Sequence, residues 1–434
     1  MHSLLSPLYA ALTGAAAVAA HLPLPGSGKV VRALRARRTA TTDLERWAHA
    51  HRDPARPLVW FHAPSVGEGL QAKPVIERLR ARHPEWQIAY TFFSPSAEKF
   101  AASLGADVVG YLPFDTTAAA NRLLATLRPT ALVFAKLDLW PRLASRARAA
   151  GVPLGMISAT LSAQSGRQGW LARAFLGDAY ASLDAVGTID PADGARLTAL
   201  GVRADRVMVT GDTRYDQVAA RADAVDRAGA LLAPLASPRP TVVAGSTWPA
   251  DDAVLCRAWE ALLHEVPAAR LIIAPHEPTR HHLEAILAWA SLAGLDCAPL
   301  ATATADTDVV LVDRVGVLGE LYALATLAYV GGGFHAAGLH SVLEPAAFGV
   351  PVLFGPRHQG SRDAGLLLAA GAGVAVEDRA ACTEALRIAC TEVDTAARAG
   401  AAARAVVDAG RGAADAATAL VERLVATGAP SPLA

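Results

Sequence analysis

Residues 58–82 read LVWFHAPSVGEGLQAKPVIERLRAR. The segment opens with an apolar run, passes through a turn of small residues and continues as an amphipathic stretch over Leu70–Arg82. At this spacing, Val75, Ile76 and Leu79 share one face of a helix. A strand followed by a tight turn and a helix begins a βαβ unit, which predicts an α/β protein with a parallel sheet covered by helices.

The same alternation fills the chain on both sides of Ala228–Pro240, a segment rich in proline and small residues that is typical of a linker between domains. Two Rossmann-like halves joined in this way predict a ligand cleft between the carboxyl ends of two parallel sheets. The predicted strands are Leu58–His62, Gln87–Phe93, Ala131–Ala135, Pro153–Ser158, Ala185–Ile189 and Val207–Thr210 before the linker, and Thr241–Ala244, Arg270–Ala274, Val309–Val312, Ala328–Val330, Val352–Phe354 and Gly373–Val376 after it.

Length and composition set the class of protein. A chain of 434 residues is too long for one ordinary core, so two domains are expected. Hydrophobic residues make up 53% of the chain, which excludes disorder, and 40 Lys and Arg balance 40 Asp and Glu, which argues against a nucleic-acid partner. The expected parts are a membrane-associated segment at 1–42, an N-terminal domain at 43–227, the linker at 228–240 and a C-terminal domain ending in helices at 241–434.

The cysteines argue against both disulfides and structural zinc. Cys256, Cys297, Cys382 and Cys390 are widely spaced and form no CxxC pair, so a reducing compartment is expected. No motif of the HExxH or EF-hand type occurs either. The sequence therefore predicts no metal site.

The first 42 residues contain no acidic side chain. Ser3–Leu24 is almost entirely apolar or small, and a stretch of roughly 20 such residues can just span a bilayer. Cations on one flank favour a cytoplasmic location for the remainder of the chain. The segment predicts a membrane anchor or interfacial helix, and a plain surface helix is the alternative. The flanking cations are Lys29, Arg32, Arg35, Arg37 and Arg38.

Two candidate sites come directly after predicted strands in the first half. Glu68 lies beyond the first strand, facing the predicted cleft; the alternative is a first-turn glutamate that interacts with its helix dipole. Lys136 and Asp138 come after the strand Ala131–Ala135. Positions i and i+2 of a strand share a face, so the two could form an ion pair pointing into the cleft, or simply a structural salt bridge.

A third candidate site lies in the second half, where a strand runs into Gly331–Gly333. Glycines allow close approach of a ligand, the next helix offers N–H groups to an anion, and Glu344 could accept hydrogen bonds from ribose hydroxyls. A structural glycine turn is the alternative. Further strand-end candidates are Arg214, Ser246, Thr247, Pro275, His276, Gly332, Gly333 and His340.

Three motifs carry a resemblance to a known family. They are His-Ala-Pro-Ser-Val-Gly-Glu at 62–68, Asp-Leu-Trp-Pro at 138–141, and Gly-Gly at 332–333 with His-Ser-Val-Leu-Glu-Pro at 340–345. Together they resemble the Kdo (3-deoxy-D-manno-octulosonic acid) transferases of lipopolysaccharide synthesis, which are inverting GT-B glycosyltransferases. The resemblance covers almost the whole chain. It implies two Rossmann-like domains facing across a cleft, with an N-terminal membrane-associated helix.

The resemblance also implies an activity and its residues. Kdo would pass from CMP-Kdo to a lipid A precursor (lipid IVA) at the cytoplasmic side of the inner membrane, beside its anionic surface and without a metal cofactor. Glu68 would be the general base, Asp138 and Arg214 would stabilise the transition state, and Lys136 is a further candidate. Backbone N–H groups near Gly332 and Ser341 would offset the charge of the leaving group. The implied CMP contacts are Pro275, His276, Val315, Gly316, Val317, Ser341, Val342, Leu343 and Glu344.

This chain departs from the family pattern at several positions. Ser341 stands where the family usually has Asn, and Asp138 stands where it has Glu. Arg214 stands where the family frequently has Lys. The segment Ala274–His276 lacks an arginine that contacts CMP, and Lys136 stands where many members have an acid. The alternatives are a GT-B transferase that uses a UDP-sugar, a nucleotide-sugar epimerase, and a non-catalytic membrane-bound sugar binder.

Overall fold

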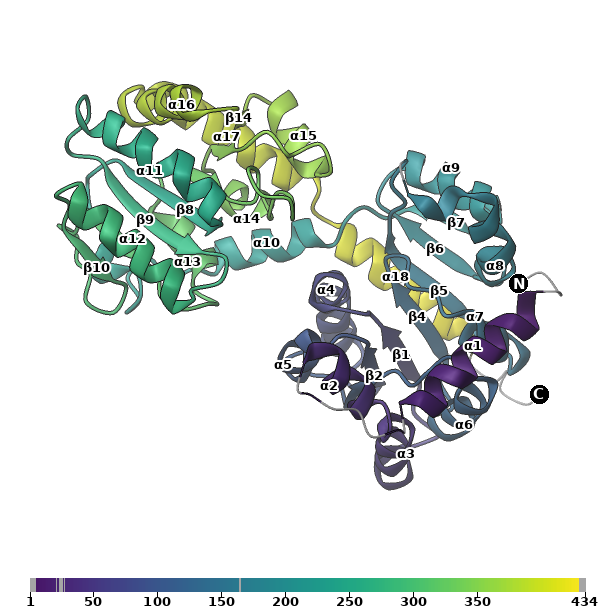
Figure 1. The fold of residues 1–434 in the computed structure, drawn as a ribbon. Coiled ribbons are helices and arrows are strands. Elements are labelled where there is room, and N and C mark those ends of the chain that lie inside the picture. The colour runs from purple at the N-terminus through teal and green to yellow at the C-terminus, as the bar shows by residue number, and fades with distance from the viewer. Residues whose placement is uncertain (1–4, 21, 23–25, 27, 164, 429–434) are drawn as a thin grey trace. The chain divides into compact units, whose positions relative to one another are not determined.

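The computed structural model describes residues 5–20, 22, 26, 28–163 and 165–428. The chain forms two compact units: an N-terminal unit of residues 1–216 and 411–434, and a C-terminal unit of residues 217–410. Figure 1 shows that each unit is a sheet with helices on both faces.

The N-terminal unit, within the described residues, is built on a parallel sheet of seven strands in the order β3-β2-β1-β4-β5-β6-β7. Every residue of the central strands is buried, because helices cover both faces of the sheet. The strands are β1 (Leu58–His62), β2 (Gln87–Phe92), β3 (Val108–Tyr111), β4 (Ala131–Ala135), β5 (Leu154–Ala159), β6 (Ala185–Thr188) and β7 (Val207–Val209).

The C-terminal unit repeats this plan in its described residues, with seven parallel strands in the order β10-β11-β9-β8-β12-β13-β14. The strands are β8 (Thr241–Thr247), β9 (Arg270–Pro275), β10 (Cys297–Pro299), β11 (Val309–Leu311), β12 (Leu327–Val330), β13 (Val352–Phe354) and β14 (Gly373–Ala375). The predicted strands are confirmed to within three residues at each end. The two strands not predicted, β3 and β10, lie at sheet edges and lack a continuous buried run.

Helices precede the first strand, connect successive strands and follow the last strand. In the N-terminal unit they are α1 (Leu5–Ala19), α2 (Lys29–Ala36), α3 (Ala40–His51), α4 (Val66–Arg82), α5 (Glu98–Ala102), α6 (Thr117–Leu127), α7 (Pro141–Ala149), α8 (Trp170–Ala181), α9 (Pro191–Leu200) and α18 (Ala413–Gly428). α10 (Arg214–Asp223) leads into the C-terminal unit, which contains α11 (Pro249–Leu263), α12 (Arg280–Leu292), α13 (Leu318–Leu321), α14 (Leu343–Ala347), α15 (Arg362–Ala369), α16 (Arg379–Thr391) and α17 (Val393–Ala409).

The units divide elsewhere than at the predicted boundaries. The expected linker 228–240 lies inside the C-terminal unit, where Leu232 and Leu235 are buried in its core. The last helix, α18, belongs to the N-terminal unit, and Figure 1 shows it in yellow against β4 and β5. Asp216 anchors its start by accepting hydrogen bonds from the backbone N–H groups of Gly412 at 2.9 Å and Ala414 at 2.8 Å. Composition could not reveal this, because α17 and α18 are both alanine-rich.

None of the helices in the described residues is long and apolar enough to cross a membrane. Of the predicted apolar stretch 3–24, residues 5–19 form α1, and residues 3, 4, 21, 23 and 24 lie outside the described residues. Tyr9 holds α1 to the unit by donating a hydrogen bond to Asp115 at 2.7 Å. Of the predicted flanking cations, Arg37 is buried: it is 6% exposed and its guanidinium lies 3.2 Å from the ring centre of Phe93.

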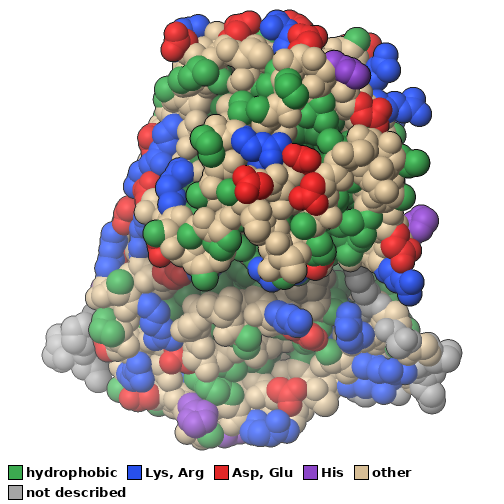
Figure 2. Space-filling model, turned by 90° about the vertical axis from the view of Figure 1, so that its left-hand side faces the viewer, with side chains coloured by type: hydrophobic (Ala, Val, Ile, Leu, Met, Phe, Trp, Pro, Cys, Tyr) green, Lys and Arg blue, Asp and Glu red, His purple; other side chains and the backbone are tan. Residues whose placement is uncertain are grey.

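The charged side chains are spread over the surface. On the face shown in Figure 2, acidic and basic side chains are interspersed. This agrees with the formal net charge of zero.

Candidate active site

The carboxyl ends of β1 and β4 form the topological switch point of the N-terminal unit. The two strands are neighbours, and the chain builds the sheet outward from them in opposite directions. Parallel sheets bind ligands at such a point. Glu68 comes after β1, and Lys136 and Asp138 come after β4, so the topology brings these three predicted residues to one edge.

Glu68 lies in the first turn of α4 and is held from two sides. The Ser65 hydroxyl donates to its Oε2 atom, and the Lys136 ammonium lies 3.4 Å from its Oε1 atom. The Glu68 side chain is 19% exposed, so solvent or a substrate can reach it. A carboxylate beside a cation at a switch point is placed to take a proton from a bound hydroxyl group.

The predicted pairing of Lys136 with Asp138 is wrong. Lys136 has a φ of +65°, a left-handed conformation that ends β4 and breaks the strand's alternation of faces. The turn directs Lys136 toward Glu68, while Asp138 pairs with His62, whose Nε2 lies 3.1 Å from the Asp138 Oδ2 atom.

Asp138 is fixed as a carboxylate by its neighbours. Burial raises the pKa of Asp138. Hydrogen bonds from His62 and Trp140 and the charges of His62 and Arg167 lower it by more than burial raises it, so the pKa lies below its ordinary value. The Trp140 indole N–H donates to the Oδ2 atom at 3.0 Å. The Nδ1 atom of His62 bonds the hydroxyl of Thr91 at 3.0 Å, and its Nε2 atom faces both the Asp138 carboxylate at 3.1 Å and the Trp140 indole N–H at 3.0 Å. The sequence motifs contain His62 and Trp140, but their spacing does not reveal that both serve Asp138.

Arg214 is the first residue of α10, and its guanidinium forms an ion pair with Asp212. Its Nε atom lies 2.9 Å and its NH2 atom 2.6 Å from the same Asp212 oxygen. The intervening Thr213 donates to the backbone carbonyl of Gln71 in α4 at 2.7 Å. This bond holds the segment against the helix that carries Glu68 in its first turn.

The predicted donor residues of the C-terminal unit lie at the carboxyl ends of β11, β9, β8 and β12, which are consecutive in its sheet. The side chains of Val342 and Leu343 are buried, so only their backbones can meet a ligand, whereas Val315 is 76% exposed. Ser246 has a φ of +55° at a break in the β8–β9 register. Such a bulge re-aims the strand end. The strand-end residues are Ser246, Thr247, Pro275, His276, Val315, Gly316, Val317, Gly332, Gly333, His340, Ser341, Val342, Leu343 and Glu344.

Asp251 fixes the glycine-rich turn after β12. Its fully buried carboxylate accepts hydrogen bonds from the N–H groups of Gly332 at 2.8 Å and Phe334 at 3.1 Å. A side chain on Gly331 would come within 2.2 Å of the Ser246 carbonyl oxygen, and Gly332 has a φ of +91°, so both positions require glycine. Because the Gly332 N–H already donates to Asp251, the predicted role of backbone N–H groups near Gly332 and Ser341 falls to the other N–H groups of these loops. Asp251 is not among the predicted residues. In the sequence it stands out only as an acidic residue in the first turn of α11, which is a common position for one.

Glu344 lies in the first turn of α14, and its side chain is 33% exposed. Burial raises its pKa above the ordinary value, and the charge of Arg221, at 3.9 Å, lowers it in part. The carboxylate is therefore only weakly paired by protein and remains available to a ligand.

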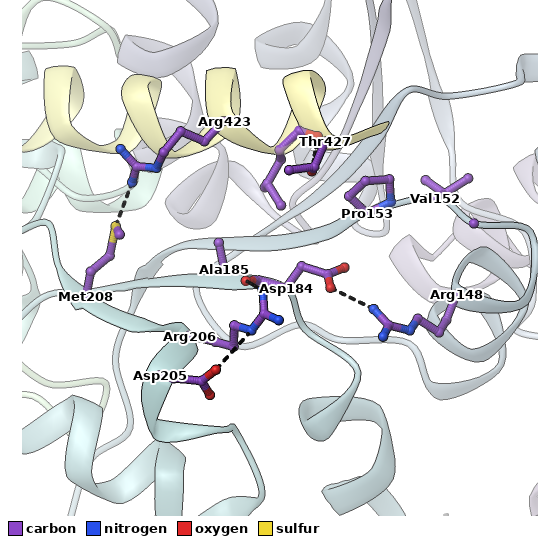
Figure 3. Close-up of a pocket in the computed structure, with 12 residues that line it drawn as sticks. Arg148, Val152, Pro153, Asp184, Ala185, Asp205, Arg206, Met208, Arg423 and Thr427 are labelled. Atoms are coloured by element: carbon purple, nitrogen blue, oxygen red, sulfur yellow. Dashed lines mark hydrogen bonds and ion pairs between the residues drawn. The ribbon is translucent and has the colours of Figure 1, made fainter. Parts of the chain in front are cut away.

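A cavity of about 440 Å³ in the N-terminal unit lies away from these residues. Figure 3 shows its lining near Pro153, Asp184 and Arg206, at the amino ends of β5, β6 and β7. Its arginines have protein partners, for example Arg148 with Asp184 at 2.6 Å. The candidate chemistry lies at the opposite ends of the strands.

Comparisons with known proteins identify the family. Residues 41–217 match the family model described as 3-deoxy-D-manno-octulosonic-acid transferase (kdotransferase). The 3-deoxy-D-manno-octulosonic acid transferase of Bordetella pertussis is 34% identical over 339 residues, which cover 75% of this chain and 77% of that protein. The chain belongs to the Kdo transferase family. The transferase is also 28% identical over 300 residues to the protein of the same description from Haemophilus influenzae, with 68% of this chain and 70% of that protein covered.

Solved structures support the fold of the transferase. A UDP-GlcNAc 2-epimerase from Neisseria meningitidis matches with a TM-score of 0.58 and 16% identity, over 81% of this chain and 98% of that one. At this identity the likeness shows the fold alone, a GT-B-like fold with two parallel Rossmann-like sheets. Family membership makes the protein a glycosyltransferase and replaces the alternatives of an epimerase and a non-catalytic sugar binder.

Proposed function

We propose that the transferase moves Kdo from CMP-Kdo to a lipid A precursor in lipopolysaccharide core synthesis. The observation that carries the proposal is the pair Glu68 and Lys136 beside the anchored carboxylate of Asp138, at the switch point of the N-terminal unit. In this proposal the N-terminal unit binds the acceptor and supplies the base, and the C-terminal unit binds the donor.

The residues divide the chemistry between them. Glu68 takes the proton of the acceptor hydroxyl. As it does so, the hydroxyl oxygen attacks the anomeric carbon of Kdo, and the bond between that carbon and the CMP phosphate breaks. Asp138 stabilises the oxocarbenium-like transition state, and Arg214 offsets the charge that grows on the leaving phosphate. Lys136, 3.4 Å from Glu68, can neutralise the Kdo carboxylate.

The donor would be held by hydrogen bonds and backbone rather than by a metal. The carboxylate of Glu344 is placed to accept from the ribose hydroxyls, and the strand-end loops with Ser246, His276 and Ser341 surround the nucleotide. We therefore expect the rate of transfer to survive a large excess of EDTA. A rate that falls with EDTA and returns with added Mg²⁺ or Mn²⁺ would show metal-assisted departure of CMP and contradict this mechanism.

We further propose that α1 and α8 rest on the cytoplasmic face of the inner membrane. The two helices are in contact, and they expose Leu12 at 60%, Val18 at 68% and Trp170 at 76%. Arg32 and Arg173 are exposed on the same unit and suit anionic lipid headgroups. An interfacial helix buries its apolar side chains in the headgroup region and needs no membrane-spanning length.

Membrane binding should depend on these apolar side chains. The double variant Leu12→Glu and Trp170→Glu should bind vesicles of anionic phospholipid at least about tenfold more weakly, because each large apolar side chain contributes roughly 1.5–3 kcal/mol when it is buried. Co-sedimentation measures the binding. Leu292→Glu, at a position that is 91% exposed on α12, is the matched control and should bind as the wild type does. Equal binding by the double variant would exclude this surface.

Turnover tests the proposed donor and acceptor. The purified full chain is incubated with a lipid A precursor and either CMP-Kdo or a set of UDP-sugars, and the product is weighed by mass spectrometry. Addition of Kdo with release of CMP is expected. Transfer from a UDP-sugar with none from CMP-Kdo would contradict the proposal.

A further inference from the structure

Four aromatic side chains stack beside the glycine-rich turn of the C-terminal unit: Trp248, His276, His335 and His340, here named the ring clasp. The His335 ring lies 4.0 Å from the indole of Trp248 with the planes 5° apart, and the His276 ring lies 4.7 Å away with the planes 24° apart. Both imidazoles are therefore stacked on the indole of Trp248.

The edge of the indole is occupied as well. The Trp248 Nε1–H donates to the His340 Nε2 atom at 3.0 Å, and the two rings lie side by side with planes 10° apart. His276 also stacks on His340 at 4.4 Å. Three histidine rings therefore already contact Trp248, which favours an indirect role for this residue in the reaction.

The ring clasp joins three loops that extend from different strands. Trp248 comes directly after β8, and His276 comes directly after β9. His335 and His340 belong to the loop after β12. Backbone hydrogen bonds link the same strand ends, since the His276 N–H donates to the Thr247 carbonyl at 2.9 Å and the Gly331 N–H donates to the Gly245 carbonyl at 2.9 Å. Every one of these loops carries a predicted donor residue.

We propose that Trp248 is a positioning residue of the donor site, which holds the three loops in register through His276, His335 and His340. The proposal rests on the proposed binding of the donor by the C-terminal unit. Misplacement of binding groups by even 1 Å is costly in such a site. Loss of the clasp should therefore weaken donor binding and leave the acceptor unaffected, because the proposed acceptor residues belong to the other unit.

The clasp also predicts a dependence on pH. Burial, together with the charges of His276 and His335, lowers the pKa of His340, and Asp251 raises it in part. The neutral His340 Nε2 atom can accept the Trp248 N–H, and the protonated one cannot. The KM for the donor should therefore rise as the pH falls and His340 becomes protonated. Trp248→Phe lacks this hydrogen bond at every pH, so its donor KM should rise less steeply.

The experiment compares Trp248→Leu and Trp248→Phe with the wild type in the full chain. The Leu variant loses both ring stacks, so its donor KM should rise about tenfold or more. The acceptor KM should stay near that of the wild type. The Phe variant keeps both stacks and should recover most of the loss. Trp289→Phe, which removes an exposed indole that donates to Glu260, is the matched control.

The outcomes separate this proposal from the proposed function. A wild type that neither binds CMP in calorimetry nor uses CMP-Kdo defeats the function itself. If the wild type binds CMP, an unchanged donor KM in folded Trp248→Leu overturns the positioning role. An equal rise of donor and acceptor KM, or a Phe variant as defective as the Leu variant, overturns it too. If the Leu variant does not fold, His335→Leu removes one stack and carries the same expectation.

Discussion

Replacing Glu68 with glutamine should lower the rate of Kdo transfer by about 10²–10⁴-fold, the range of a general base. Glutamine can still accept the hydrogen bond that Ser65 donates to Glu68, but its amide cannot take up the proton of the acceptor hydroxyl. CMP affinity and the melting temperature should not change, because the donor contacts are assigned to the C-terminal unit. Initial rates with saturating donor and acceptor measure the effect.

The control for this change lies on the same helix. Glu77→Gln alters an exposed glutamate that pairs with Lys73, and it should keep the wild-type rate. A Glu68→Gln variant that keeps more than about a third of the wild-type rate would remove Glu68 from the role of base. A rate that recovers in Glu68→Asp, with its shorter carboxylate, would show that charge is needed at this site.

Much of the fold could be predicted, because buried parallel strands are continuous apolar runs. β1, β4 and β13 match their predicted bounds residue for residue. β3 and β10 could not be found in this way, since edge strands leave part of their side chains in solvent. The place of α18 could not be found either, because its contact with Asp216 joins positions about 200 residues apart and leaves no local pattern.

The candidate site was predictable in its location and unpredictable in its contacts. Parallel sheets gather the carboxyl ends of their strands on one edge, so motifs at those ends must lie near one another. The contacts depend on left-handed turns at Lys136, with a φ of +65°, and Ser246, with a φ of +55°. Local propensity gives little warning of such turns in residues other than glycine. This is why the alternation of a strand assigns Lys136 the wrong partner.

Replacing Glu344 with alanine should raise the KM for the CMP-sugar donor by roughly one or two orders of magnitude, because hydrogen bonds to a charged group contribute about 1.5–3 kcal/mol. The acceptor KM should change little. Glu344→Gln should recover part of the loss, since its carbonyl oxygen can still accept from a ribose hydroxyl. Glu384→Ala, on an exposed glutamate that pairs with Arg387 in α16, is the control and should leave both KM values unchanged.

Stability separates this role from a structural one. Burial raises the pKa of Glu344 above the ordinary value of 4.5, so the folded protein binds this proton more tightly than the unfolded chain does. Protonation therefore favours folding, and stability falls as the pH rises from 4.5 through the folded pKa. Above that range Glu344→Gln should melt higher than the wild type while binding the donor more weakly. If Glu344 only braced α14 through Arg221, both variants would melt lower and both substrates would suffer alike. An unchanged donor KM in a folded Glu344→Ala enzyme would contradict the assignment of Glu344 to the ribose, because loss of a carboxylate that binds the donor must weaken donor binding.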